Sequence, residues 1–285
     1  WNNAPKNLLT LSPGQWMEFA FHPLAQYADE IGLDLDVNEL IVKTDLIDYY
    51  HSIPERFEVA KNIRNSEDVL RIEPHEQGFQ LSSRDVVSGE ERLYTCKYLV
   101  LATGQRGQLR DLQVSGEDLP FVTGRYDKPE DFPGERVVVV GGGRSGDWAA
   151  VELHDAGKQV YYAMRQDPAV HWQLINDSRQ GLPYYKRIAE ILESRSPRLD
   201  SMYHTQVTKI GEGGQVELET PDGARIIEVD HVIKEIGGVA DYSILQGFDA
   251  LQLTPMRDNY RFQVNQVRTH AHNYESLDID NLYIG

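Results

Sequence analysis

A glycine-rich stretch with the spacing G-x-G-x-x-G lies at Gly141–Gly146. The apolar run Arg136–Val140 precedes it and Asp147–Leu153 follows it, an order typical of a buried strand, a tight turn and a helix start. The first glycine permits the turn, the second lets a pyrophosphate approach the backbone, and the third lets the helix pack on the strand. We expect a dinucleotide to contact Gly141, Gly142, Gly143, Arg144, Ser145 and Gly146. The alternative is a tight turn that binds no ligand.

The strand predicted at Gln159–Met164 bears on the choice of nucleotide. A site selective for NAD usually has an aspartate or glutamate at the end of this strand, where it binds the ribose 2′-hydroxyl. Here the position holds Met164, and Arg165 comes next. A guanidinium suits a 2′-phosphate, which a carboxylate would repel, so the sequence favours NADPH. The alternative is that Arg165 is a solvated surface charge.

These segments predict a parallel sheet containing Val137–Val140 and Gln159–Met164, with the helix from Ser145 on one face. Elsewhere the apolar periodicity predicts helices over residues 14–31, 45–52 and 182–194. Pro23 would break or kink the first of these helices, and Thr44 would cap the second. Residues 105–135 are rich in Gly, Pro and Asp and are expected to form a connection.

One strand pattern occurs twice in the chain. In the first copy, Val69–Ile72 is followed by a hairpin and by the buried strand Lys97–Ala102. In the second copy, Val207–Ile210 is followed by a hairpin and by the buried strand His231–Ile236. Each buried strand leads into glycine. Two such units around one glycine-rich turn predict two dinucleotide-binding domains of similar design. The alternative is a pair of unrelated hairpins.

Composition limits the function further. The chain has 285 residues, enough for two domains, and a formal net charge of −17, which argues against a nucleic-acid partner. Its apolar runs are too short to span a bilayer. Cys96 is the single cysteine, so the chain forms neither an internal disulfide nor a C-x-x-C redox pair. We therefore expect a reducing, cytoplasmic compartment.

Three segments carry a resemblance to a known family: Tyr98–Gly104, Gly116–Pro120 and Phe132–Gly146. The chain resembles the flavoproteins with two dinucleotide-binding domains, which include flavin-containing monooxygenases, thioredoxin-reductase-like enzymes and bacillithiol-disulfide-reductase-like proteins. Asp280–Gly285 resembles the strand that leads into the second flavin motif of this family. The resemblance covers residues 40–285, and it concerns the fold and cofactors more than the substrate.

The resemblance implies an α/β fold of two Rossmann-like domains with β-meander insertions. An FAD domain (residues 1–118 and 246–285) would be interrupted by an NADPH domain (residues 119–245). The residues expected at FAD are Val69, Ala102, Thr103 and Gly104. Those expected at NADPH are the glycine-rich turn, Arg165, Gly237 and Gly238. In such enzymes NADPH passes a hydride to the flavin N5, while the protein orients both cofactors and excludes water.

The sequence departs from the family pattern in three places. The family's N-terminal G-x-G-x-x-G for FAD does not occur in Trp1–Leu11, and the sequence stops at Gly285, where the family continues into a helix that faces the flavin. We therefore expect both ends to be truncated, and these 285 residues to hold FAD poorly on their own. The monooxygenase fingerprint F-x-G-x-x-x-H-x-x-x-[YW] is degenerate at Phe121–Gly124.

Four further side chains are candidates for chemistry. His270 and His272 precede the C-terminal strand. On a strand they would point the same way and face the flavin ring or a metal. The alternative is that they are hydrogen-bonded loop histidines. His171 and Trp172 would start a loop and contact nicotinamide or substrate, or simply pack. Cys96 is expected to be a small buried strand residue. Because it is the single cysteine and lies on a hairpin outside the NADPH domain, a thioredoxin-reductase dithiol mechanism is excluded.

Three functions remain open at this point. The first is an NADPH-dependent flavoenzyme of monooxygenase type, acting on a small molecule. The second is a disulfide- or ferredoxin-type reductase without an internal dithiol, acting on a redox partner. The third is a non-enzymatic chain that binds a nucleotide without flavin. A homodimer is the expected assembly, and a visible spectrum of the protein separates the third function from the first two.

Overall fold

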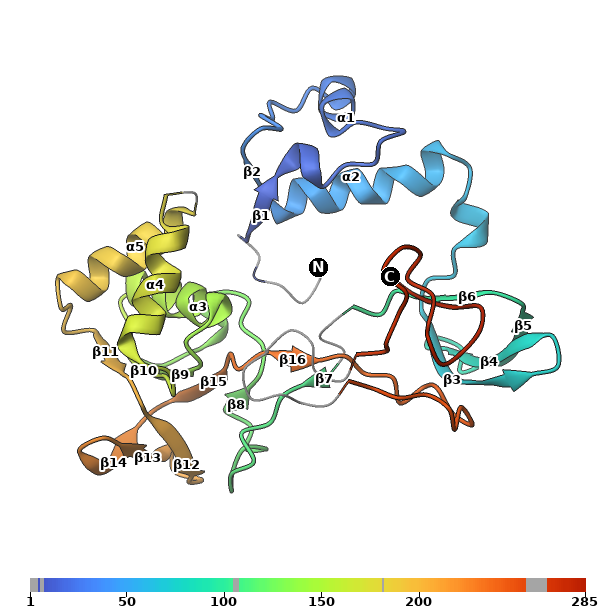
Figure 1. Cartoon of the computed structure of the whole chain (residues 1–285). Coiled ribbons are helices and arrows are strands. Elements are labelled where there is room, and N and C mark those ends of the chain that lie inside the picture. Colours follow the sequence, from blue (N-terminus) through green and yellow to red (C-terminus); the bar gives the residue numbers. More distant parts are fainter. Residues whose placement is uncertain (1–4, 6–7, 105–107, 181, 255–265) are drawn as a thin grey trace. The chain divides into compact units, whose positions relative to one another are not determined.

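The computed structural model describes residues 5, 8–104, 108–180, 182–254 and 266–285 (Figure 1). The chain divides into two compact units. The first unit holds Trp1–Ala60 and Asp111–Ile236, and the second holds Lys61–Arg110 and Gly237–Gly285. The predicted assignment of residues 1–118 and 246–285 to FAD and of 119–245 to NADPH stays a prediction.

A five-stranded parallel sheet forms the centre of the first unit, with the strand order β11-β10-β9-β15-β8. Its strands are β8 (Val122–Thr123), β9 (Arg136–Val140), β10 (Gln159–Ala163), β11 (Leu199–Met202) and β15 (His231–Lys234). The run Val137–Val140 is buried throughout because layers cover both faces of the sheet. The predicted parallel sheet is confirmed, and β10 ends one residue before the predicted Met164.

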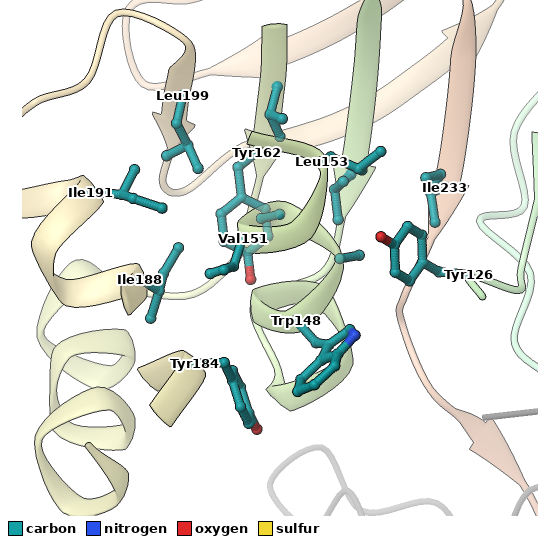
Figure 2. Close-up of a cluster of buried hydrophobic side chains, with 14 of the residues drawn as sticks. Tyr126, Trp148, Val151, Leu153, Tyr162, Tyr184, Ile188, Ile191, Leu199 and Ile233 are labelled. Carbon is teal, nitrogen blue, oxygen red and sulfur yellow. The ribbon is translucent and has the colours of Figure 1, made fainter. Parts of the chain in front are cut away.

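Three helices pack on one face of this sheet: α3 (Arg144–Asp155), α4 (Pro168–Ser178) and α5 (Pro183–Glu193). Val137 and Val139 of β9 belong to the core on the helical side. Figure 2 shows this core, with Val151 of α3 between Ile188 of α5 and Ile233 of β15. The predicted helices after Ser145 and over residues 182–194 are confirmed within a residue or two.

A three-stranded antiparallel meander covers the other face, so Val138 and Val140 of β9 pack with the apolar side chains of the meander. Alternate side chains of one strand therefore enter two different cores, as strand geometry requires. The strands of the meander are β12 (Gln206–Ile210), β13 (Gln215–Thr220) and β14 (Gly223–Glu228).

The second unit also contains a three-stranded meander followed by a strand that pairs in parallel. Its meander consists of β3 (Glu67–His75), β4 (Gly78–Asp85) and β5 (Glu91–Cys96). A short strand, β6 (Leu99–Leu101), follows and pairs in parallel with β17 (Leu282–Ile284), while β7 (Gln108–Leu109) pairs with β16 (Gly238–Val239). In both copies a meander precedes a strand that pairs in parallel, which is β6 in the second unit and β15 in the first. β6 and β15 belong to different sheets. The predicted internal repeat is thus confirmed as a repeat of topology.

The N-terminal segment differs from its prediction. It contains β1 (Leu9–Pro13), η1 (Gly14–Trp16), α1 (Leu24–Ile31), β2 (Leu40–Val42), α2 (Lys43–Arg56) and η2 (Ala60–Asn62). The expected break at Pro23 is confirmed, because its ring and missing N–H cannot continue a helix and α1 begins directly after it. The predicted helix before Pro23 was wrong, since only η1 forms there. Thr44 is not the cap of α2 either; the helix begins at Lys43 after Val42, without a side-chain capping bond.

Residues 105–135 were predicted to be a connection, and the described part of them contains two short strands, β7 and β8, and η3 (Pro129–Asp131). Among the described residues, no helix combines the length and the apolar character that a membrane crossing requires.

Candidate functional site: a glycine-rich turn at the centre of the parallel sheet

The glycine-rich turn lies at the carboxyl end of β9. β10 and β15 flank β9, so the strand order reverses its direction there. In open α/β sheets ligands bind outside the carboxyl ends of the strands at such a reversal. The turn leads directly into α3, whose first residue is Arg144. The predicted sequence of strand, turn and helix is therefore confirmed.

The glycines of the turn differ in what surrounds them. Gly141 has a φ of +121°, and a Cβ there would lie 2.2 Å from the carbonyl oxygen of Glu235. A Cβ on Gly146 would lie 1.9 Å from the carbonyl oxygen of Gly141. Both positions therefore need glycine for the packing of the chain itself. A Cβ on Gly143 would meet nothing within 4 Å in the described part of the chain, which therefore gives no steric reason for glycine at this position.

The N-terminus of α3 is directed at this turn. Gly143 is the N-cap residue, and no side chain caps the helix. The amide groups of the first helical turn carry a partial positive charge that favours an anion. Arg144 is exposed, with its guanidinium 5.5 Å from the centroid of the Tyr185 ring. The turn therefore offers backbone donors and a nearby cation to a negatively charged ligand.

The segment after β10 lies against the glycine-rich turn. Gln166 Nε2 donates a hydrogen bond of 2.7 Å to the carbonyl oxygen of Gly142, and a Cβ on Gly142 would lie 2.4 Å from Gln166. Met164 is fully buried, whereas Arg165 is exposed beside it. The position that holds a carboxylate in NAD sites thus contributes to the core, and the guanidinium is accessible to solvent.

A carboxylate does occur nearby, but it has other partners. Asp167 is the N-cap of α4: its Oδ1 accepts a 2.7 Å hydrogen bond from the amide of Ala169. Its Oδ2 lies 3.4 Å from Nε2 of His204. Capping the helix and pairing with the imidazole account for both of its oxygens.

A buried polar cluster beneath the turn was missed by the sequence analysis. Asp147 is fully buried, and its Oδ1 accepts hydrogen bonds from the Tyr162 hydroxyl (2.8 Å) and from Nε2 of His171 (2.7 Å). Nδ1 of His171 is 3.0 Å from the Tyr203 hydroxyl. Burial, and then the nearby carboxylate, raise the pKa of Tyr162 well above its usual value and the pKa of Tyr203 to about 12. Both tyrosines therefore stay protonated as hydrogen-bond donors.

This cluster corrects the prediction for His171 and Trp172. Both residues lie within α4 and not in a loop. His171 is fully buried with protein partners on both ring nitrogens, so it is not available to nicotinamide or substrate. Trp172 is partly buried and packs against the helical core, as the alternative interpretation expected.

The other predicted residues lie in the second unit. Val69 is on β3, and Ala102, Thr103 and Gly104 follow β6 as exposed residues, with Gly104 at a φ of +78°. Gly237 has a φ of +82°, and Gly238 begins β16. Roles for these residues at FAD or NADPH stay predictions. Cys96 lies on β5 as predicted but is half-buried, and burial raises the pKa of its thiol.

His270 and His272 do not lie on a strand. They are exposed at a turn, and their ring centroids are 5.6 Å apart. The expectation of a shared strand face was therefore wrong, and the proposed catalytic role stays a prediction. Among the described residues, no cluster of three or more His, Cys, Asp or Glu has a geometry that would hold a metal ion.

The degenerate fingerprint at Phe121–Gly124 forms one wall of a pocket of about 430 Å³ in the first unit. Its lining includes Thr123, Arg125, Tyr126, Phe132 and His231. The rings of Tyr126 and Phe132 stack at 5.6 Å, and the Tyr126 hydroxyl donates to Glu152. The segment itself contains β8, which pairs in parallel with β15, so it has a structural role that does not depend on the histidine missing from the motif.

A glycine-rich turn at the reversal point of a parallel sheet, with a meander on one face and helices on the other, defines an α/β dinucleotide-binding unit. The chain belongs to the pyridine nucleotide-disulphide oxidoreductase family, whose sequence profile matches residues 5–283. Members are flavin-dependent enzymes that bind FAD and NAD(P)H.

Solved structures and curated sequences agree with this membership. The fold is similar to bacillithiol disulfide reductase from Bacillus cereus (TM-score 0.80, 20% identity, 100% of this chain and 78% of that chain). It is also similar to a flavin-containing monooxygenase from Stenotrophomonas maltophilia (TM-score 0.66, 18% identity, 100% and 78%). At these identities the likeness concerns the fold alone.

Among curated sequences, "Probable indole-3-pyruvate monooxygenase YUCCA9" of Arabidopsis thaliana is 30% identical over 120 residues, which is 40% of this chain and 28% of that protein. A ferredoxin–NADP reductase of Ignicoccus hospitalis is 40% identical over 80 residues, 28% of this chain and 26% of that protein. The matched regions thus span little more than a quarter of these relatives.

Proposed function

We propose that this chain belongs to an FAD-dependent NADPH oxidoreductase of the flavin monooxygenase type. Residues 119–245 would hold NADPH, and residues 1–118 with 246–285 would hold FAD. The observation that carries the proposal is the open space at Gly143, beside the N-terminus of α3 and next to the segment with the exposed Arg165. The chain itself gives no reason for glycine there, whereas an approaching pyrophosphate does.

Each part of the site has a role in this proposal. The amides at the start of α3 bind the pyrophosphate, and Gly141 and Gly146 allow the turn to lie close to the sheet. Arg165 pairs with the 2′-phosphate, while Gln166 holds its segment against Gly142. FAD, when bound, supplies the ring that accepts the hydride. The protein orients the two cofactors and keeps water from the reacting atoms.

A reductase without an internal dithiol is the second candidate function, and the degenerate monooxygenase fingerprint at Phe121–Gly124 favours it. Cys96 is the single cysteine, and burial raises the pKa of its thiol, so it is a poor thiolate nucleophile. Electrons would therefore pass directly from flavin to an external disulfide or redox protein. Measuring NADPH oxidation with oxygen and a soft nucleophile, and separately with a disulfide, distinguishes the two functions.

Reduction of bound flavin tests the whole proposal. We expect the purified full-length protein, supplied with FAD and mixed with NADPH without oxygen, to lose its visible flavin absorbance, and to lose it faster with NADPH than with NADH. The measurement is a stopped-flow absorbance trace. A protein that binds NADPH but remains colourless after incubation with FAD would instead be a non-enzymatic nucleotide-binding chain.

Arg165→Ala tests the preference for NADPH. Removing the guanidinium should weaken NADPH binding by about 1.5–3 kcal/mol, the range for hydrogen bonds to charged groups, and should barely change NADH binding. Titration of both nucleotides measures the effect. Arg179→Ala removes an exposed arginine at the C-cap of α4, where it pairs with Glu193, and serves as the control. Equal losses for NADH and NADPH in Arg165→Ala would leave Arg165 a surface charge.

A further inference from the structure

The turn after β11 lies directly against the segment that carries Arg165. β10 and β11 are parallel and in register up to Ala163 and Met202. Beyond that pair, the amide of Thr205 donates to the carbonyl of Met164 (2.9 Å), and the amide of His204 donates to the carbonyl of Gln166 (3.4 Å). These two bonds straddle Arg165. The backbone therefore places His204 beside Arg165.

The conformation of His204 is unusual. Its φ is +50°, in the left-handed region that residues with a Cβ seldom adopt. The hydrogen bonds of the turn to the segment after β10 hold it there. Half of the side chain is exposed, and Nε2 lies 3.4 Å from Oδ2 of Asp167. A strained residue at the carboxyl edge of the sheet, with its ring accessible, is the kind of feature found at binding sites.

His204 makes the charges around this position complementary to a phosphate. A 2′-phosphate carries between one and two negative charges near neutral pH, and Arg165 supplies a single positive charge. Asp167 opposes binding unless it is paired. Protonated imidazole has two N–H donors, so Nε2 can pair with Asp167 while Nδ1 donates to the phosphate. The Gln166 amide is already engaged with Gly142.

We propose that His204 is the second cationic group of the 2′-phosphate subsite and, with Arg165, determines the preference for NADPH. The inference rests on the proposed function and assigns to it a specificity residue in the turn after β11, which the sequence pattern did not single out. His204 neutralises Asp167 and donates to the phosphate. NADH, which lacks that phosphate, gains nothing from it.

Two asparagine substitutions test this assignment with little effect on the fold. His204→Asn removes the charge but keeps a residue that tolerates the left-handed conformation, and Asp167→Asn keeps a good N-cap. We expect His204→Asn to weaken NADPH binding about tenfold and to leave NADH binding unchanged. Asp167→Asn should strengthen NADPH binding, and the double variant should recover part of the loss caused by His204→Asn.

The readout is the dissociation constant for NADPH and NADH, and for adenosine 2′,5′-bisphosphate against 5′-AMP, which differ only in the 2′-phosphate. His51→Asn, an exposed residue of α2, is the charge-removal control. Equal losses for both members of a pair, or no loss at all, in His204→Asn overturn the inference. If the inference fails but Arg165→Ala still removes the NADPH preference, the proposed function survives. If Arg165→Ala leaves the NADPH preference unchanged, the proposed function fails as well.

Discussion

Gly143→Val is expected to abolish the binding of both NADPH and NADH while the protein stays folded. The backbone of Gly143 is extended, with a φ of −106° and a ψ of −176°, a conformation that valine adopts readily. A Cβ there meets no atom of the described residues within 4 Å. The isopropyl group would therefore occupy only the space into which the pyrophosphate must come. We expect a loss of at least about 100-fold in affinity for both nucleotides.

Titration of both nucleotides, together with a thermal melting curve, measures this prediction. Gly146→Ala is the matched counterpart, because its added methyl would lie 1.9 Å from the carbonyl oxygen of Gly141. That variant should lose about 1–3 kcal/mol of stability through overpacking, with the loss of binding following from the distorted turn. Wild-type nucleotide affinity in Gly143→Val would place the ligand away from this turn.

The sequence reveals the central strand–turn–helix unit because its signals are local. The valines of β9, the spacing of Gly141, Gly143 and Gly146, and the apolar face of α3 lie within one short segment. The two meanders could also be predicted, since each is a run of neighbouring hairpins. The structure adds the reason for each glycine: two are required by contacts in the chain, and one faces open space.

The surroundings of the site could not be predicted in the same way. His171 lies 24 residues after Asp147, and the Tyr203 hydroxyl joins them from beyond β11, so no local spacing reveals their contact. His204 is beside Arg165 only because β11 pairs with β10. Apolar periodicity also predicted a helix that starts at residue 14, whereas α1 begins only after Pro23. Contacts of this kind depend on strand order, which one sequence does not specify.

Asp147→Ala is expected to destabilise the protein by about 2–6 kcal/mol, because each of the two buried donors left without an acceptor costs about 1–3 kcal/mol. The substitution leaves the Tyr162 hydroxyl and Nε2 of His171 buried without their shared acceptor. These groups link α3, β10 and α4. Their loss should therefore loosen the helices behind the glycine-rich turn. Urea denaturation followed by circular dichroism measures the change in the free energy of unfolding.

Asp147→Asn distinguishes the hydrogen bonds from the charge. Its Oδ1 can still accept from both Tyr162 and His171, and its amide would take the place of Oδ2, which has no partner among the described residues. We expect this variant to keep most of the stability, within about 1 kcal/mol of wild type, because burying a neutral amide costs less than burying a carboxylate. If Asp147→Ala is as stable as Asp147→Asn, the cluster does not hold α3 and α4 together, and their packing depends on the apolar core alone.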